Sequence, residues 1–148
     1  MDVCKGTLRT DEAHCIGQSI HDGIDLLAMI PCGFPSPATE YIENNLNLHD
    51  YIVKKPAATF FMRAGGDSMT GIGIYPDDIL VIDRSIKPRS GHVVVAAIDG
   101  EYTLKILKIH EGKPYLVPAN PKYQPISVDN MESLQIFGVL TYNIHKHG

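Results

Sequence analysis

From residue 59 onward, hydrophobic residues occur in short runs rich in Val, Ile, Phe and Tyr, and clusters of Gly, Pro and Asp separate these runs. Runs of this length with such boundaries are typical of β-strands. We therefore expect a mainly β fold. The predicted strands are Thr59–Ala64, Ile79–Asp83, His92–Ile98, Glu101–Lys108, Tyr115–Pro118 and Leu134–Asn143.

One hairpin can be predicted in detail. The run Val93–Ile98 is followed by Asp99-Gly100 and then by the run Glu101–Leu107. Asp-Gly fits a two-residue type I′ turn, in which both central residues need a positive φ. Side chains alternate between the two faces of a strand. One face of the second strand is therefore expected to hold Glu101, Thr103, Lys105 and Leu107, and the other Tyr102, Leu104, Ile106 and Lys108.

The pattern before residue 59 is weaker. Residues 1–25 are polar and show no sustained period, which favours a flexible arm. The run Leu26–Ile30 is compatible with a strand or with one helical turn. Pro37 suits the first position of a helix with Ser36 as its N-cap, so we expect one short helix there. Its apolar face would be formed by Ala38, Tyr41 and Ile42, and it would end at Asn44-Asn45.

The composition fits one soluble domain plus an arm, with 148 residues of which 44% are hydrophobic and 20% charged. The longest hydrophobic run, Val93–Ile98, is far shorter than the roughly 18 residues that a membrane span needs. The acidic N-terminal stretch is unlike a secretory signal, so we expect a cytoplasmic protein. A net charge of −4 leaves no basic surface for phosphate, and direct nucleic-acid binding is not expected.

The chain changes character near residue 32. Its three cysteines, Cys4, Cys15 and Cys32, all precede Gly33, and residues 1–32 hold five acidic but only two basic side chains. An odd number of cysteines confined to one arm argues against a disulfide framework. The two prolines that follow Gly33 keep the chain extended, because each biases its predecessor away from the helical region.

The first candidate for chemistry is the serine in Gly65-Gly66-Asp67-Ser68-Met69, which follows a predicted strand. Glycines before a serine allow a tight bend and close approach to a bound peptide. A serine placed there can expose its hydroxyl while nearby main-chain N–H groups point at a developing oxyanion. The same residues also form ordinary turns, and the spacing alone does not choose between these readings.

The second candidate is Lys105, in the middle of a strand whose hairpin partner is almost entirely apolar. Most strand lysines lie on a solvated face. A lysine that is buried among apolar side chains instead loses part of its charged form, because desolvation lowers its pKa. A neutral amine could then take the proton of the Ser68 hydroxyl and act as a general base.

Other candidates carry less weight. A Ser-His-Asp triad would require a histidine beside Ser68, but the histidines are scattered and are expected at the surface. His14-Cys15 with Cys4 lacks the spacing of a metal site. Cys32 could be a thiol nucleophile, but its extended, proline-flanked segment is more typical of a substrate.

Together these segments resemble the self-cleaving serine–lysine proteases of the LexA and UmuD family, and the UmuD-like branch most closely. The repressors of this family carry a DNA-binding domain, for which an acidic stretch of 31 residues before Cys32 is too short. The resemblance covers residues 30–142 in order. It is carried by Cys32-Gly33-Phe34-Pro35-Ser36-Pro37, Gly66-Asp67-Ser68-Met69, Tyr75–Asp83, Gly91–Lys105 and Phe137-Gly138-Val139.

The resemblance implies the family's catalytic fold of twisted β-strands and hairpins, with Ser68 as nucleophile and Lys105 as general base. It also implies that the main-chain N–H groups of Ser68 and Asp67 bind the oxyanion, and that Cys32–Gly33 is the scissile bond. Self-cleavage would then remove the arm 1–32 and leave a peptidase-like β domain, 33–148. No cofactor or metal is implied.

The UmuD-like branch further implies a homodimer and cleavage stimulated by RecA filaments on single-stranded DNA during the SOS response. The shortened product is expected to join a UmuC-type Y-family polymerase in error-prone translesion synthesis. A hypothesis from another class is a non-enzymatic polymerase accessory subunit that keeps the dyad as a relic. The presence of Ser68, Lys105 and a glycine at position 33 favours the self-cleaving enzyme.

Overall fold

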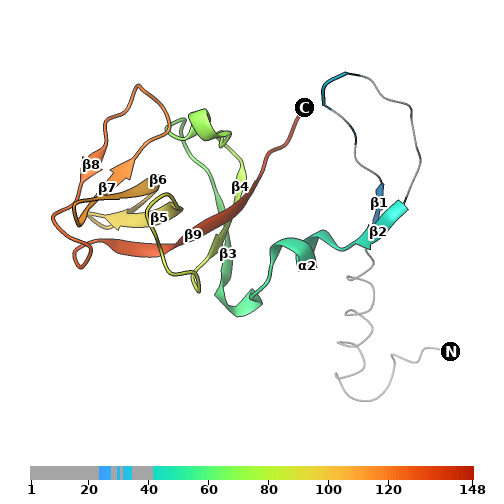
Figure 1. Ribbon diagram of the computed structural model, residues 1–148, viewed down its shortest axis with the longest axis horizontal. Helices are drawn as coiled ribbons and strands as arrows, with labels where there is room; N and C mark the ends of the chain where they lie inside the picture. Colours follow the sequence, from blue (N-terminus) through green and yellow to red (C-terminus); the bar gives the residue numbers. More distant parts are fainter. Residues whose placement is uncertain (1–23, 28–29, 31, 35–41) are drawn as a thin grey trace, which may run out of the picture. The chain divides into compact units, whose positions relative to one another are not determined.

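The computed structural model describes residues 24–27, 30, 32–34 and 42–148 (Figure 1). Packing divides the chain into two compact units, with the boundary between Tyr51 and Ile52. In the first unit, β1 (Ile24–Leu27) pairs antiparallel with β2 (Ile42–Leu46), and α2 (Leu48–Ile52) follows at the boundary. The prediction of an arm 1–32 and a domain 33–148 concerns a chemical cut and stays a prediction.

The second unit is built on one antiparallel sheet of seven strands, so the predicted mainly β fold is confirmed. The order across the sheet is β3-β4-β9-β5-β6-β7-β8, which places the C-terminal strand β9 inside the sheet, between β4 and β5. Two 3₁₀ turns, η1 (Pro56–Ala58) and η2 (Thr70–Ile72), lie in the connections. The strands are β3 (Thr59–Arg63), β4 (Ile79–Asp83), β5 (Val93–Ile98), β6 (Glu101–His110), β7 (Lys113–Val117), β8 (Ile126–Ser127) and β9 (Gln135–Ile144).

The predicted hairpin is confirmed. Strands β5 and β6 pair in the expected register, with Ile98 opposite Glu101. The two turn residues, Asp99 and Gly100, have φ angles of 49° and 81°. Both values are positive, as a type I′ turn requires, and only Gly adopts such angles without steric cost.

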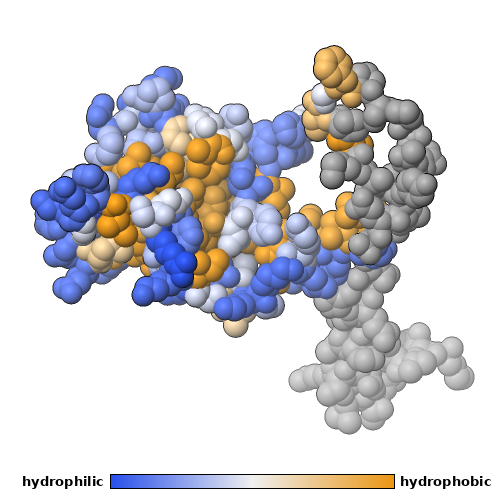
Figure 2. Space-filling view, viewed as in Figure 1, coloured by the Kyte–Doolittle hydropathy of each residue, from blue (hydrophilic) through white to orange (hydrophobic). Residues whose placement is uncertain are grey.

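Hydrophobic side chains pack on both faces of the sheet, because successive residues of its central strands point in opposite directions. On β5, Val94 and Ala96 belong to one buried cluster, whereas Val95 belongs to the other. Figure 2 shows one view of this unit, in which hydrophobic residues gather over the middle of the sheet. The first cluster is completed by Leu107, Leu116, Leu134 and Val139, and the second by Met69, Ile74, Leu80 and Ile82.

The predicted helix that ends at Asn44-Asn45 is wrong in its described part. Ile42–Leu46 forms strand β2, in which Asn44 lies opposite Leu26 and Asn45 opposite Asp25. This strand pairs with residues 15 to 22 positions earlier in the chain. The backbone hydrogen bonds that such pairing supplies cannot be read from a local helical pattern. Ser36, Pro37, Ala38 and Tyr41 lie outside the described residues. The α-helix in the described part of the chain is α2, and the run that begins at Leu26 enters β1 as a strand.

Candidate functional site

The candidate nucleophile Ser68 lies in a tight turn between β3 and η2. Just after β3, the N–H of Ala64 donates to the carbonyl of Asp78, and the N–H of Asp77 donates to the carbonyl of Ala64, both at 2.9 Å. The chain then bends at Gly66, whose φ of 79° suits glycine. The turn presents Ser68 to a pocket of about 370 Å³ that residues of β3, β4, β5 and β6 also line. A peptide segment could enter a pocket of this size.

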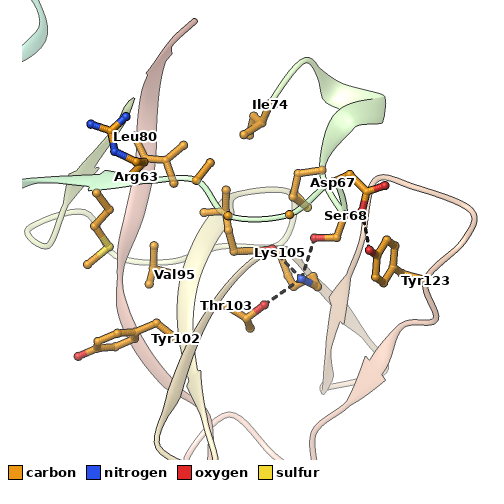
Figure 3. Close-up of a pocket in the computed structure, with 16 residues that line it drawn as sticks. Arg63, Asp67, Ser68, Ile74, Leu80, Val95, Tyr102, Thr103, Lys105 and Tyr123 are labelled. Atoms are coloured by element: carbon orange, nitrogen blue, oxygen red, sulfur yellow. Dashed lines mark hydrogen bonds between the residues drawn. The ribbon is translucent and has the colours of Figure 1, made fainter. Parts of the chain in front are cut away.

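Lys105 of β6 contacts the hydroxyl of Ser68 inside this pocket (Figure 3). Its Nζ atom lies 3.1 Å from Ser68 Oγ, although the two residues are 37 positions apart in sequence. Nζ also donates to Thr103 Oγ1 at 2.8 Å and to the carbonyl oxygen of Leu104 at 3.0 Å. Thr103 and Lys105 therefore share a face of β6, as the alternation predicted. The three contacts hold the amine against the serine.

The surroundings of Lys105 favour its neutral form. Only 9% of the residue is exposed, and Leu107 on the same strand is fully buried. Burial lowers the pKa of Lys105 below the ordinary lysine value of 10.5, because desolvation penalises the ammonium form. The amine can thus lose its proton at a lower pH than a solvated lysine, which a general base requires.

The turn that holds Ser68 is fastened to the segment after β7. The N–H of Ala119 donates to the carbonyl of Ser68 at 2.8 Å, and the N–H of Gly71 donates to the carbonyl of Ala119 at 2.7 Å. A Cβ atom at position 71 would lie only 2.3 Å from the Ala119 carbonyl oxygen. Gly71 is therefore needed for the close approach of the two segments. Sequence reasoning missed the segment 119–123, which lies more than 50 residues beyond Ser68.

A buried carboxylate, that of Asp78, joins the end of β9 to the loop between η2 and β4. Asp78 is 1% exposed and accepts hydrogen bonds from the N–H of Tyr75 at 2.9 Å and from Asn143 Nδ2 at 3.0 Å; it also pairs with His145. Burial alone would raise the pKa of Asp78, but these hydrogen bonds outweigh desolvation and lower it. Asn143 Nδ2 also donates to the carbonyl of Gly73. The end of β9 is thereby tied to the loop that follows η2.

The other predicted site residues have different settings. Cys32 and Gly33 belong to the first unit, where both are exposed. For the main-chain N–H groups of Asp67 and Ser68, no hydrogen bond to another main-chain group is seen within the described part of the chain.

The described residues hold neither a candidate metal centre nor a candidate membrane-spanning helix. No group of three or more His, Cys, Asp or Glu side chains is placed there to hold a metal ion. Among the same residues, none of the helices has the length and apolar character needed to cross a membrane.

The fold and the site are those of a β domain with a serine–lysine pair in a pocket, and the comparisons with known proteins give its family. Residues 25–141 match the Peptidase S24-like family, and the chain belongs to that family. Three relatives are similar over most of their length, and they make the chain a UmuD-like member of the LexA and UmuD family.

The first relative is protein SamA of Salmonella typhimurium, which is 47% identical over 116 residues, or 78% of this chain and 80% of SamA. Protein ImpA of Shigella flexneri is 46% identical over 116 residues, or 77% of each chain. Protein MucA of Escherichia coli is 42% identical over 122 residues, or 82% of this chain and 83% of MucA.

Proposed function

We propose that the protein is a self-cleaving serine peptidase that cuts its own Cys32–Gly33 bond. The observation that carries this proposal is the 3.1 Å contact between Ser68 Oγ and the buried Lys105 Nζ. A nucleophile and a base within hydrogen-bonding reach of each other are the minimal apparatus of covalent acyl transfer. The test is the mass of the purified chain after incubation across a range of pH, because a single cut at this bond yields two fragments of known mass.

The proposed reaction begins with neutral Lys105, which takes the proton of the Ser68 hydroxyl as Oγ attacks the carbonyl carbon of Cys32. The N–H groups of Ser68 and Asp67 stabilise the resulting oxyanion. The Lys105 ammonium then donates its proton to the departing amine of Gly33, and the acyl-enzyme forms. Water, deprotonated by Lys105, hydrolyses the ester and restores Ser68. Throughout, Thr103 Oγ1 and the carbonyl of Leu104 orient the amine toward Ser68.

The identity of the scissile bond can be tested at the glycine. Gly33→Glu should reduce self-cleavage at least about a hundredfold, because a charged side chain next to the attacked carbonyl must be desolvated as the bond enters the pocket. Gly33→Ala, which adds only a methyl group, should retain measurable cleavage. Mass spectrometry identifies the fragments, and the amount of fragment formed over time at alkaline pH gives the rates.

A serine-reactive phosphonate probe provides the control for these variants. It should label Ser68 in Gly33→Glu as fast as in the wild type, because the catalytic groups are unchanged. If Gly33→Glu cleaved itself at the wild-type rate, the cut would have to lie at another bond.

Control of the reaction is proposed to act through docking of the tethered substrate. Because the bond is part of the same chain, its rate depends on the fraction of molecules in which the Cys32–Gly33 segment occupies the pocket. A RecA filament on single-stranded DNA would favour the docked state during the SOS response. The shortened product would then act with a UmuC-type Y-family polymerase in cytoplasmic translesion synthesis. Cleavage that is unaffected by added RecA filaments would remove this control from the proposal.

The proposed homodimer is supported by an aromatic surface that comprises Phe60, Arg84, Tyr102 and Phe137, of which Phe137 is half-buried and the other three are exposed. The rings of Phe60 and Tyr102 both contact Phe137 edge-on, with centroids 5.4 Å apart. The Arg84 guanidinium lies 4.6 Å from the centre of the Phe137 ring. Aromatic residues and Arg are the types enriched in protein interfaces, and a second copy of the chain is the proposed occupant.

Two neighbouring residues of β3 test this interface. Phe60→Glu should convert the dimer to a monomer, because Phe60 is 41% exposed on the aromatic surface and a charge there would be buried at the interface. Phe61→Glu is the matched control, since Phe61 is 57% exposed and points to the opposite side of the strand. Sedimentation equilibrium measures the association state of both variants. Equal association of Phe60→Glu and Phe61→Glu would show that the dimer uses another surface.

A further inference from the structure

Asp67, the residue before the candidate nucleophile, is held by two side chains of the segment 119–123. Asn120 Nδ2 donates to the main-chain carbonyl of Asp67 at 2.9 Å. The hydroxyl of Tyr123 donates to the carboxylate oxygen Oδ1 of Asp67, a contact that spans 56 residues of sequence (Figure 3). The turn is thus held at its backbone and at its side chain, one residue from the hydroxyl that attacks.

The segment 119–123 is built to present these two groups. Asn120 uses both ends of its amide, because its Oδ1 accepts from the N–H of Lys122 at 3.0 Å while its Nδ2 reaches Asp67. The N–H of Tyr123 closes the turn on the carbonyl of Asn120 at 3.1 Å. Tyr123 also lines the pocket, but the contacts of Lys105 are to Ser68, Thr103 and Leu104 and do not include it.

We propose that Tyr123 is a positioning residue for self-cleavage: through its hydrogen bond to the Asp67 carboxylate, it fixes the Asp67–Ser68 peptide group whose N–H faces the oxyanion. This inference rests on the proposed function. An oxyanion donor stabilises the transition state only where it already points at the developing charge, so the turn must not relax during the reaction. A peptide group tied through the side chain on one side and through the carbonyl on the other meets this requirement.

The hydrogen bond keeps Tyr123 in its donor form. Contact with the Asp67 carboxylate raises the pKa of Tyr123, so its hydroxyl stays protonated to a higher pH than that of a free tyrosine. Tyr123 is 44% exposed, and loss of its hydroxyl leaves no cavity in the core. Its removal should therefore affect orientation more than folding.

The test is the pH–rate profile of self-cleavage in Tyr123→Phe. The plateau rate at high pH should fall about tenfold, less than the hundredfold or more that follows complete loss of an oxyanion donor. The pH midpoint of the profile should stay at the wild-type value, because the environment of Lys105 is unchanged. A midpoint displaced to higher pH would mean that the whole site had loosened and that Lys105 had regained water, which would overturn the positioning role.

A double-mutant cycle with Asp67→Ala tests whether the loss of rate in Tyr123→Phe arises from its hydrogen bond to Asp67. Tyr123→Phe should have no additional effect in the Asp67→Ala background, because the hydrogen bond is already absent there. Asp67→Asn should cleave faster than Asp67→Ala, since an amide oxygen can accept the same hydrogen bond from Tyr123. If Tyr123→Phe lowered the cleavage rate as much in the Asp67→Ala background as in the wild type, Tyr123 would act through the substrate. That result would overturn the proposal.

Tyr115→Phe is the matched control. It removes a tyrosine hydroxyl from β7, outside the pocket, and should leave the profile unchanged. If Tyr123→Phe cleaves like the wild type, the inference fails while the proposed function stands. If the wild type neither cleaves itself nor reacts at Ser68 with a phosphonate probe, the proposed function fails and the inference fails with it.

Discussion

Ser68→Ala and Lys105→Ala should each reduce self-cleavage by a factor of about 10⁴ or more, the scale seen when one member of a catalytic dyad or triad is removed. Ser68→Ala removes the atom that forms the acyl-enzyme. Lys105→Ala leaves the hydroxyl of Ser68 without the amine that lies 3.1 Å away, so the serine keeps its proton. The double variant should be no slower than either single variant, because neither group works without the other. The measurement is fragment mass after days at alkaline pH.

These variants must keep their fold for the result to be informative, and the structure indicates that they do. Ser68→Ala deletes one oxygen from a half-buried residue, and Lys105→Ala removes a charge that burial already destabilises. Melting temperature and far-ultraviolet circular dichroism check this directly. Cleavage at the wild-type rate by folded Ser68→Ala protein would eliminate the serine mechanism.

A serine-reactive phosphonate probe separates the enzyme from a non-enzymatic accessory subunit with a relic dyad. An active dyad should direct the probe to Ser68 in the wild type and leave Ser68→Ala unlabelled. Lys105→Ala should react slowly, because an unactivated serine is a poor nucleophile. Equal, slow labelling of the wild type and Lys105→Ala would support the accessory subunit. The close packing of Lys105 on Ser68 favours the enzyme.

Local patterns predicted the part of the fold that local interactions determine. The β5–β6 hairpin was predictable because Asp99-Gly100 has the turn chemistry and the flanking runs alternate in register. The same alternation placed Lys105 and Thr103 on one face of β6, and their hydrogen bond follows from it. A strand with a strong turn needs no information from distant parts of the chain.

The remaining features depend on contacts between distant residues, which a sequence pattern does not encode. Ile42–Leu46 becomes a strand because β1 pairs with it, whereas its own residues were equally compatible with a helix. The two-residue strand β8 was missed since it is too short to show alternation. Asn120 and Tyr123 follow a strand and resemble ordinary loop residues, and only the folded chain brings them to Asp67. The only signal in the sequence was the presence of hydrogen-bonding side chains after a predicted strand. That signal does not indicate which residue they bind.

The rate of self-cleavage should rise about tenfold for each pH unit until the pH reaches the pKa of Lys105, and it should level off above that value. The sign follows from the base: only the neutral amine can accept the Ser68 proton, and raising the pH increases its fraction. Because burial lowers this pKa below 10.5, the plateau should begin below the pH at which an ordinary lysine titrates. Fragment mass at a series of pH values from 6 to 11, without RecA, gives the profile.

The pH dependence of folding stability provides an independent measure of the lowered pKa of Lys105. The unfolded chain binds the Lys105 proton more tightly than the folded chain does, so between the two pKa values stability should increase with pH. Lys105→Met should remove this increase and raise the melting temperature at neutral pH, since an apolar side chain of similar length has no charge to desolvate. Lys108→Met is the matched control, because Lys108 is exposed on the opposite face of β6. It should keep both the wild-type rate profile and the wild-type dependence of stability on pH. A flat rate profile in the wild type, with melting temperatures that Lys105→Met leaves unchanged, would show that Lys105 remains charged and is not the base.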